Sequence, residues 1–145
     1  MIAVSRARPP ATTGGVIVLD ASVVVELLLA SDAGRRATDR LVQLQADLHA
    51  PELMDVEVLH VLRRAASNAR LSAARAEEAM VVLETLPVRR HGHGALRRRV
   101  WQHRANLSAY DATYVALAEG LGGRLMTRDA RLAGAPGLAI AVEVI

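Results

Sequence analysis

A direct strand-to-helix transition near the N-terminus most constrains how this chain can fold. Residues 16–20, VIVLD, form a short β-branched run that ends in an acid, and residues 21–29, ASVVVELLL, continue at once with a helical pattern. An apolar strand that passes straight into a helix indicates a β–α crossover, and crossovers join parallel strands. The transition therefore predicts a parallel sheet, for which the rest of the chain must supply the neighbouring strands.

Strand and helix patterns alternate along the remaining sequence. Further short strands are expected at residues 48–50, 88–90, 124–127 and 139–145, and helices at residues 33–46, 52–69, 72–85, 95–105 and 108–119. Ser72 and Ser108 are placed as N-caps, and a glycine cluster at residues 120–123 ends the last long helix. This order predicts an α/β fold, a three-layer αβα sandwich around a central parallel sheet with right-handed crossovers.

The length of 145 residues suits a single domain. Residues 1–15 contain adjacent prolines and glycines without periodicity, so we predict a flexible leader there and a folded domain over residues 16–145. No apolar run approaches the ~18 residues of a membrane span, and the N-terminus lacks the apolar region of a secretory signal. We therefore expect a cytoplasmic protein with no membrane partner.

The residue inventory removes several kinds of chemistry. The chain has no cysteine, which excludes disulfides, thiolate nucleophiles and cysteine-based zinc sites. All 18 basic residues are arginine, so Schiff-base chemistry and the phosphate-binding lysine of P-loop proteins are also excluded. No Ser-His-Asp arrangement stands out. The net charge of +3 mildly favours a polyanionic partner, because arginine pairs well with phosphate.

Three aspartates are placed by the predicted fold at one rim of the sheet. Asp20 and Asp129 both stand where a strand gives way to a helix. Open parallel sheets bind ligands beyond the carboxyl ends of their strands, which is where these two acids are expected. Asp111 lies three residues after Ser108, in the first turn of the next helix, and is expected to lean towards the same rim.

Glu57 is a fourth acid, set in a helix that is otherwise nearly all apolar. A buried ionised carboxylate is costly unless it is paired or bound to a metal. Mg²⁺ and Mn²⁺ prefer carboxylate oxygens, and such ions allow several acids to share one site where bare like charges would repel. The four acids therefore predict metal-assisted phosphodiester hydrolysis by a bound water, with no protein nucleophile.

Each aspartate also has a purely structural interpretation. Asp20 could cap a helix, Asp111 could form a capping box with Ser108, and Asp129 could form an Asx turn. For any one of them alone the structural interpretation is favoured.

Two alternatives concern the fourth acid. Glu57 could be held by Arg64 on its own helix or by a buried partner, and Asp55 could replace it as a metal ligand. The spacing alone does not separate these two acids.

Four blocks of sequence resemble the PIN-domain ribonucleases, specifically the VapC-type toxins of bacterial toxin–antitoxin pairs. The resemblance covers residues 16–145 and rests on VLDASVVV, PELMDVEVLHVLRR, LSAYDATYVALAEGLGGRL and MTRDARLA, in the order and spacing of such proteins. Each block is weak alone, and together they are specific. The chain departs from the pattern in its 15-residue leader and at His60, where similar proteins often carry asparagine.

The resemblance implies roles for individual residues. It makes Asp20 and Asp111 direct ligands of Mg²⁺ or Mn²⁺, and it favours Glu57 over Asp55. Glu57 and Asp129 would complete the acidic pocket, directly or through water. The hydroxyl groups of Ser22 and Thr127 would orient the carboxylates. The resemblance further implies an RNA substrate, a homodimer and a small cognate antitoxin that blocks the pocket.

Residues 85–110 contain no acid and accumulate arginines around Trp101. The candidate RNA-binding residues are Arg97, Arg98, Arg99 and Arg104. The alternative is a solvated helix that packs inward through Leu96, Val100 and Leu107. His91 and His93 in the HGHG segment are interpreted as structural or incidental loop residues rather than as a metal pair.

Two classes of function follow from these observations. The favoured one is a metal-dependent endoribonuclease that acts as the toxin of a toxin–antitoxin system. The alternative is a catalytically inactive PIN-like binding or regulatory module, in which one of the four acids would lie outside the pocket. A phospho-accepting receiver domain is disfavoured because the chain has no lysine.

Overall fold

The computed structural model describes residues 14–145 and contains a five-stranded sheet, in which all neighbouring strands run parallel. The strand order is β3-β2-β1-β4-β5. The strands are β1 (Val16–Leu19), β2 (Asp47–Pro51), β3 (Val88–His91), β4 (Arg124–Thr127) and β5 (Val142–Val144). The α/β class and the parallel sheet expected from the sequence are thereby confirmed.

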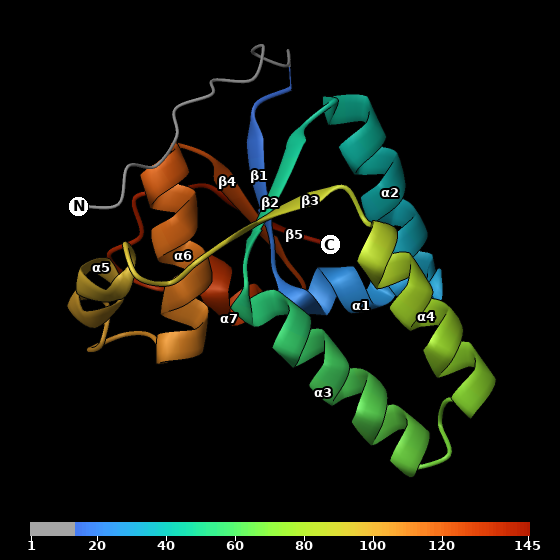
Figure 1. Cartoon of the computed structure of the whole chain (residues 1–145). Coiled ribbons are helices and arrows are strands. Elements are labelled where there is room, and N and C mark those ends of the chain that lie inside the picture. The colour runs from blue at the N-terminus through green and yellow to red at the C-terminus, as the bar shows by residue number, and fades with distance from the viewer. Residues whose placement is uncertain (1–13) are drawn as a thin grey trace.

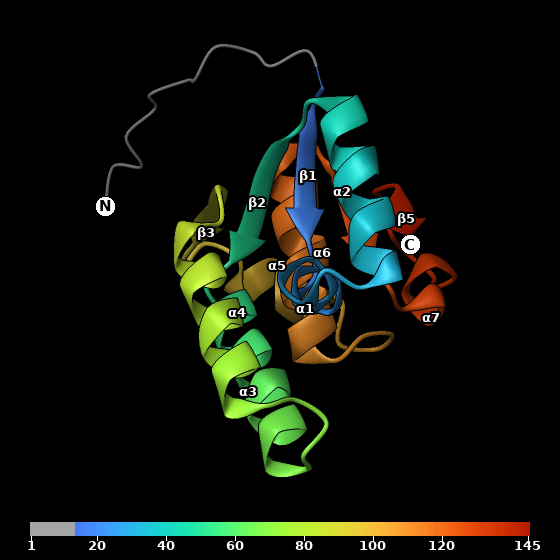
Figure 2. The ribbon, with the colours of Figure 1, turned by 90° about the vertical axis from the view of Figure 1, so that its right-hand side faces the viewer.

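Helices cover both faces of this sheet (Figure 1). They are α1 (Ala21–Leu29), α2 (Asp32–Leu44), α3 (Leu53–Ser67), α4 (Ala73–Thr85), α5 (Arg97–Gln102), α6 (Ala109–Leu121) and α7 (Ala130–Ala133). Helix α6 packs on β1, β2 and β4 with α5 outside it, whereas α1 to α4 lie on the other side. Figure 2 shows α3 and α4 side by side as a pair that extends beyond the end of the strands.

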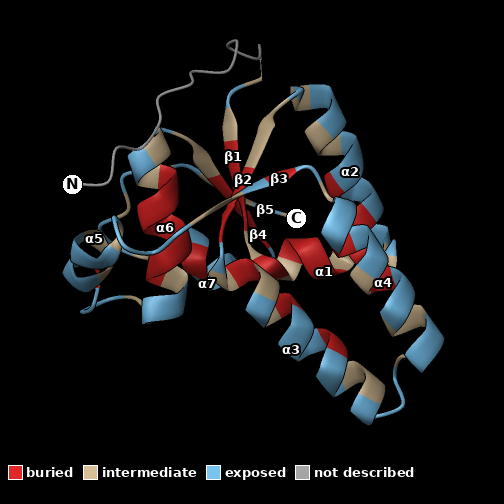
Figure 3. Cartoon of the chain, in the orientation of Figure 1, coloured by how far each residue is buried: buried red, intermediate tan, exposed pale blue. Residues whose placement is uncertain are grey.

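The core lies between α6, the central strands and α1. Ile17, Val18 and Leu19 of β1 and Leu125 and Met126 of β4 are at most 1% exposed, as expected for strands buried on both faces. In Figure 3 the buried colour runs along most of α6 but forms only a thin stripe on α3. The sequence contains no phenylalanine, so aliphatic side chains make up nearly all of this core.

The predicted N-caps Ser72 and Ser108 are confirmed, whereas α6 continues through Gly120 to Leu121, two residues beyond its predicted end. The Ser72 hydroxyl accepts a hydrogen bond from the backbone N–H of Arg75, and the Ser108 hydroxyl accepts one from Asp111. Gly122 ends α6 in a left-handed conformation with φ of 64°, which glycine adopts without a steric cost. The cap at Ser108 places Asp111 in the first turn of α6.

Three local expectations differ from the structure. Helix α5 covers only Arg97–Gln102, and β5 covers only Val142–Val144, both shorter than predicted. Helix α3 is not buried all round, because it packs at the edge of the molecule through one stripe and leaves Val56 65% exposed. The predicted leader, residues 1–15, lies outside the described residues except for its last two glycines. No helix in residues 14–145 is long and apolar enough to cross a membrane.

Candidate active site

Asp20 lies directly after β1, at the carboxyl end of the sheet, and begins α1. Its backbone occupies the N-cap position, but its side chain makes no capping hydrogen bond. The carboxylate oxygen Oδ2 instead accepts hydrogen bonds from the hydroxyls of Ser22 at 2.6 Å and Thr127 at 2.8 Å. The capping interpretation of Asp20 is therefore wrong, and its carboxylate is held across the β1–β4 junction.

The same two hydroxyls tie Asp20 to the loop that follows β4. Ser22 Oγ accepts a hydrogen bond from the backbone N–H of Arg128, and Thr127 Oγ1 accepts one from the N–H of Asp129. Each hydroxyl thus donates its proton to the Asp20 carboxylate and accepts a hydrogen bond from a backbone N–H of the loop. The arrangement fixes the position of Asp129 relative to Asp20.

Glu57 projects from the first half of α3 towards this rim. Its Oε2 atom accepts a hydrogen bond of 3.1 Å from the hydroxyl of Tyr114, which is buried in α6. Burial raises the pKa of Glu57, the Tyr114 hydrogen bond opposes that rise, and the nearby charges of Asp20 and Asp111 add to it. Of the alternatives left open by the sequence, a buried partner holds Glu57, and none of its hydrogen bonds involves Arg64.

Asp55 points elsewhere. Its carboxylate accepts hydrogen bonds from Nε and Nη2 of Arg90, with the shortest contacts at 3.0 Å. Arg90 also donates to backbone carbonyls at the end of α4, so the pair joins β3 to the α3–α4 layer. Glu57 faces the other acids and Asp55 does not.

Asp111 sits in the first turn of α6, beside Ser108. Burial raises the pKa of Asp111, and the charge of Asp20 is the next largest cause. The hydrogen bond with Ser108 opposes the rise, while Asp129 adds to it. The raised pKa therefore reflects burial first, and the nearby charges of Asp20 and Asp129 add to it.

Asp129 keeps its structural role as well. Its Oδ1 atom accepts a hydrogen bond from the N–H of Arg131, forming the Asx turn that starts α7. The Arg131 guanidinium also binds both carboxylate oxygens, at 3.1 and 2.9 Å, and lowers the pKa of Asp129. Asp111 and Asp129 line a common hollow of about 210 Å³.

The donor set fits a hard divalent cation. The acids lie close enough for their charges to interact. Asp20 raises the pKa of both Glu57 and Asp111, and Asp129 raises that of Asp111. Within residues 14–145 no three acidic or histidine side chains converge into a complete ligand group. Mg²⁺ in proteins is commonly bound by one or two carboxylates and retains several water molecules. Two of these carboxylates are therefore enough to bind it.

The four candidate RNA-binding arginines have different surroundings. Arg99 Nη2 and Nε both bind Glu119 on α6, and the buried His103 contacts the same carboxylate at 3.2 Å. Hydrogen bonding from Arg99 lowers the pKa of Glu119. Arg99 therefore anchors α5 to α6, while the other three belong to the outer surface of this region.

Arg104 places its guanidinium over the ring of Trp101, 4.9 Å from the ring centroid. Arg97 lines a groove beside the same ring. The histidines of the HGHG segment have structural contacts: His91 Nε2 lies 2.8 Å from His49 Nδ1, and His93 Nε2 accepts the N–H of Leu53.

Two contacts of the site escaped the sequence analysis. Tyr114 was not singled out in the sequence, and only the structure shows that its buried side chain reaches Glu57. Arg128 and Ser31 both donate to the carboxylate of Glu26 on α1, which ties the β4 loop to the first helix. A tyrosine in the turn after Asp111 was the available signal for the first contact, and no local pattern indicates the second.

The structure combines an αβα sandwich with acidic side chains at the carboxyl end of its parallel sheet. A family model described as the PIN domain matches residues 17–138, and the chain belongs to that family. Ribonuclease VapC9 of Mycobacterium tuberculosis is 44% identical over 118 residues, covering 80% of this chain and 87% of the relative. The chain is thus a VapC-type member of the PIN-domain family.

Solved structures share the fold. VapC20 of M. tuberculosis, described as a sarcin–ricin-loop-cleaving toxin, aligns with a TM-score of 0.62 and 21% identity, covering 85% of this chain and 96% of that one. VapBC of Salmonella typhimurium, solved bound to DNA, aligns with a TM-score of 0.66 and 14% identity, covering 88% and 96%. At these identities the likeness concerns the fold.

Proposed function

We propose that this protein is an endoribonuclease that hydrolyses RNA phosphodiester bonds with Mg²⁺ or Mn²⁺ and acts as the toxin of a toxin–antitoxin pair. The observation that supports the proposal is that four acids from separate segments lie near one another at one end of the sheet: Asp20 and Asp111 raise the pKa of Glu57, and Asp20 and Asp129 raise that of Asp111. Membership of the VapC-type PIN domains supports it. We place this activity in the cytoplasm, where RNA substrates are present.

Asp20 and Asp111 would hold the ion, and Glu57 and Asp129 would add oxygens directly or through water. When bound, such an ion lowers the pKa of a water molecule and stabilises charge on the departing oxygen. The hydroxyl of Thr127, together with that of Ser22, keeps the Asp20 carboxylate aimed into the pocket.

Two further side chains of the chain prepare the pocket. Tyr114 holds one oxygen of Glu57, so the other oxygen remains available to a ligand. Asp129 exchanges its Arg131 contact for a ligand at low cost, because the Arg131 side chain is 91% exposed and such a surface ion pair is weak.

Arginines on the outer side of α5 would bind the RNA backbone. Within residues 14–145, Arg97, Arg98 and Arg104 form no ion pair with a carboxylate, whereas Arg99 is bound to Glu119. Phosphate contacts of this kind position an RNA without reading its sequence. We expect the contribution of Arg99 to be indirect, through the position of α5.

The proposed partners are a cognate antitoxin and a second copy of the chain. The likeness to the VapBC structure of S. typhimurium supports the antitoxin, which would cover the acidic pocket and stop cleavage. The homodimer remains a prediction, and sedimentation analysis of the purified protein tests it.

The decisive experiment measures cleavage of RNA by the purified chain. Cleavage should require Mg²⁺ or Mn²⁺ and stop with EDTA, and both Asp20→Asn and Asp111→Asn should abolish it. Asp39→Asn, which neutralises an exposed aspartate on α2, serves as the matched control and should cleave normally. Full activity in both pocket variants would refute the carboxylate assignment.

The inactive binding module is the second candidate, in which one of the four acids would take no part in holding a metal ion. It predicts that the chain binds RNA or its partner without cutting, in any divalent metal. The same cleavage assay separates the two candidates.

A further inference from the structure

A groove lies between α5, the start of α6 and the first residue of α3. It has a volume of about 300 Å³ and a mostly apolar lining that includes Leu53, His93, Arg97, Val100, Trp101 and Tyr110. We name it the Trp101–Tyr110 groove. Tyr110 also lines the adjacent groove of about 510 Å³ that contains Glu57. The two grooves therefore meet at Tyr110, which precedes Asp111 in the chain.

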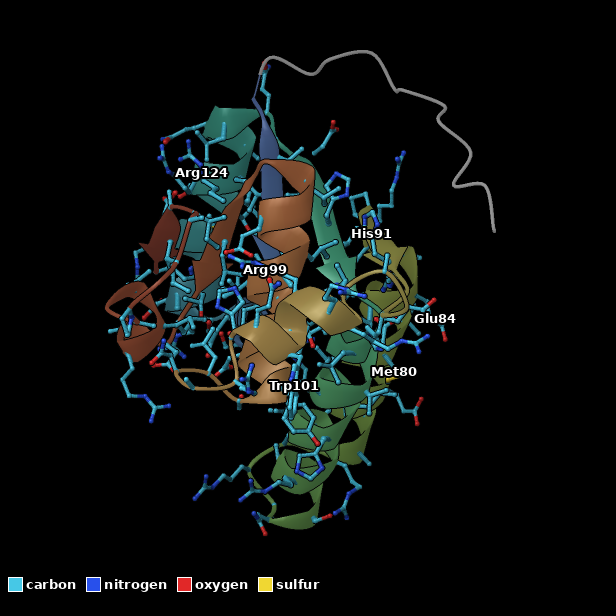
Figure 4. The ribbon with its side chains drawn as sticks, turned by 90° about the vertical axis from the view of Figure 1, so that its left-hand side faces the viewer. Met80, Glu84, His91, Arg99, Trp101 and Arg124 are labelled. Atoms are coloured by element: carbon cyan, nitrogen blue, oxygen red, sulfur yellow. The ribbon has the colours of Figure 1, made fainter. Side chains whose placement is uncertain are left out.

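Two large aromatic rings are exposed beside this groove. Trp101 is 67% exposed and Tyr110 is 62% exposed, while Tyr114, the remaining aromatic side chain, is buried in the core. Figure 4 shows Trp101 on the outward side of α5. Exposed rings beside a groove provide flat surfaces on which another planar group can stack.

Charge around the groove identifies the class of ligand. Residues 85–110 contain no acid, Arg97 lines the groove, and Arg104 lies over one face of Trp101. An apolar partner protein needs no such excess of positive charge, whereas a nucleotide combines a planar base with an anionic phosphate. The combination of exposed rings and guanidinium groups is that of surfaces that bind single-stranded nucleic acid.

We propose that the Trp101–Tyr110 groove holds an unpaired RNA base by stacking, beside the phosphate that is cleaved. The proposal rests on the ribonuclease function and adds to it a binding site for one base of the RNA substrate. Bases within an RNA helix are stacked and inaccessible to side chains, so loops and single strands are selected. The adjacent groove, which is lined by Glu57, shares Leu53 and Tyr110 with this one, so a base on Tyr110 would lie beside one of the acids of the pocket.

The first test uses fluorescence, because Trp101 is the only tryptophan in the chain. The full-length protein in EDTA is titrated with a short oligoribonucleotide that has no self-complementarity. Stacking should quench Trp101 emission, and an oligomer of the same length without bases should not. RNA binding detected by anisotropy without any change in Trp101 emission overturns the proposal.

The second test uses matched variants and labelled RNA. Trp101→Leu keeps an apolar side chain but loses the ring, and should weaken binding by roughly 5- to 100-fold. Trp101→Phe keeps a ring and should recover much of that loss. Thermal unfolding should be nearly unchanged in both, because the replaced side chain is largely exposed. Equal RNA affinity of Trp101→Leu and the wild type overturns the proposal.

The groove could instead receive a second copy of the chain, and the same probe distinguishes this case. Trp101 emission that shifts with protein concentration in the absence of RNA, together with a dimer that Trp101→Leu disrupts, overturns the proposal. If the proposed ribonuclease function were wrong, the result would differ, because the wild type would then cleave no RNA in Mg²⁺. A wild type that cleaves, beside a Trp101→Leu variant that cleaves and binds equally well, refutes the groove alone.

Discussion

The Thr127 hydroxyl joins the two halves of the acidic pocket, so Thr127→Val should weaken both the fold and the metal site. Thr127 is fully buried, donates to Asp20 at 2.8 Å and accepts from the N–H of Asp129 at 3.0 Å. Valine has nearly the same shape, so packing is preserved and the change removes only the hydroxyl. A hydrogen bond to a charged group contributes ~1.5–3 kcal/mol, and the N–H left without a partner costs ~1–3 kcal/mol.

These two effects together predict that Thr127→Val loses about 3 kcal/mol of unfolding free energy, which corresponds to a melting temperature about 6–12 °C lower. Mg²⁺ affinity should fall by roughly 10- to 100-fold, as for other groups that orient a metal ligand. Calorimetry of unfolding in EDTA gives the first quantity, and titration with Mg²⁺ gives the second.

Thr113→Val is the matched control for this experiment. Thr113 is also buried, but its hydroxyl donates only to the Ala109 carbonyl of its own helix, so its loss should cost within about 1 kcal/mol. Its Mg²⁺ affinity should stay at the wild-type value. If the two variants were equally stable and bound Mg²⁺ equally well, the hydroxyl would not be holding Asp20, and the reasoning would be wrong.

Two other predictions concern acids of contrasting role. Glu57→Gln should abolish RNA cleavage, whereas Asp55→Asn should lower the melting temperature and leave a measurable cleavage rate, because only Glu57 faces the pocket; the opposite pattern in a cleavage assay would reverse the assignment. Glu119→Gln should lower the free energy of unfolding by about 1 kcal/mol at pH 7. The pKa of Glu119 is lowered in the folded chain, so the ionised carboxylate stabilises the fold above its ordinary pKa of 4.5. This stabilisation disappears as the pH falls through the lower pKa of the folded chain. The free energies of unfolding of wild type and variant should therefore converge in acid. A constant difference down to the acid transition would contradict this.

Much of the fold follows from local patterns. The apolar run of β1, the serine caps and the glycine after α6 each act within a few residues, so periodicity and turn chemistry place them correctly. The extent of α5 and β5 did not follow, because their ends depend on neighbours distant in sequence. The exposure of Val56 on α3 likewise depends on how few elements surround that helix.

The candidate site divides in the same way. Asp20, Asp111 and Asp129 could be placed together from their positions at strand and helix ends, since all parallel strands end at one edge. The choice between Glu57 and Asp55 could not be made from spacing, because the two lie on one helix and differ by direction alone. Only the tertiary arrangement brings Glu57 of α3 to Tyr114 of α6, and only β3 brings Arg90 to Asp55.

By itself the sequence determined the parallel α/β architecture, the inventory of carboxylates without thiols or lysines, and the edge of the sheet where the acids gather. The tertiary structure decided which acids face one another and which hydroxyls hold Asp20. It also decided that Arg99 binds Glu119 of α6, whereas Trp101 remains exposed. The physical reason is range. Strand and helix signals arise from neighbours along the chain, but the orientation of a carboxylate and the state of its partners depend on side chains that only folding brings into contact.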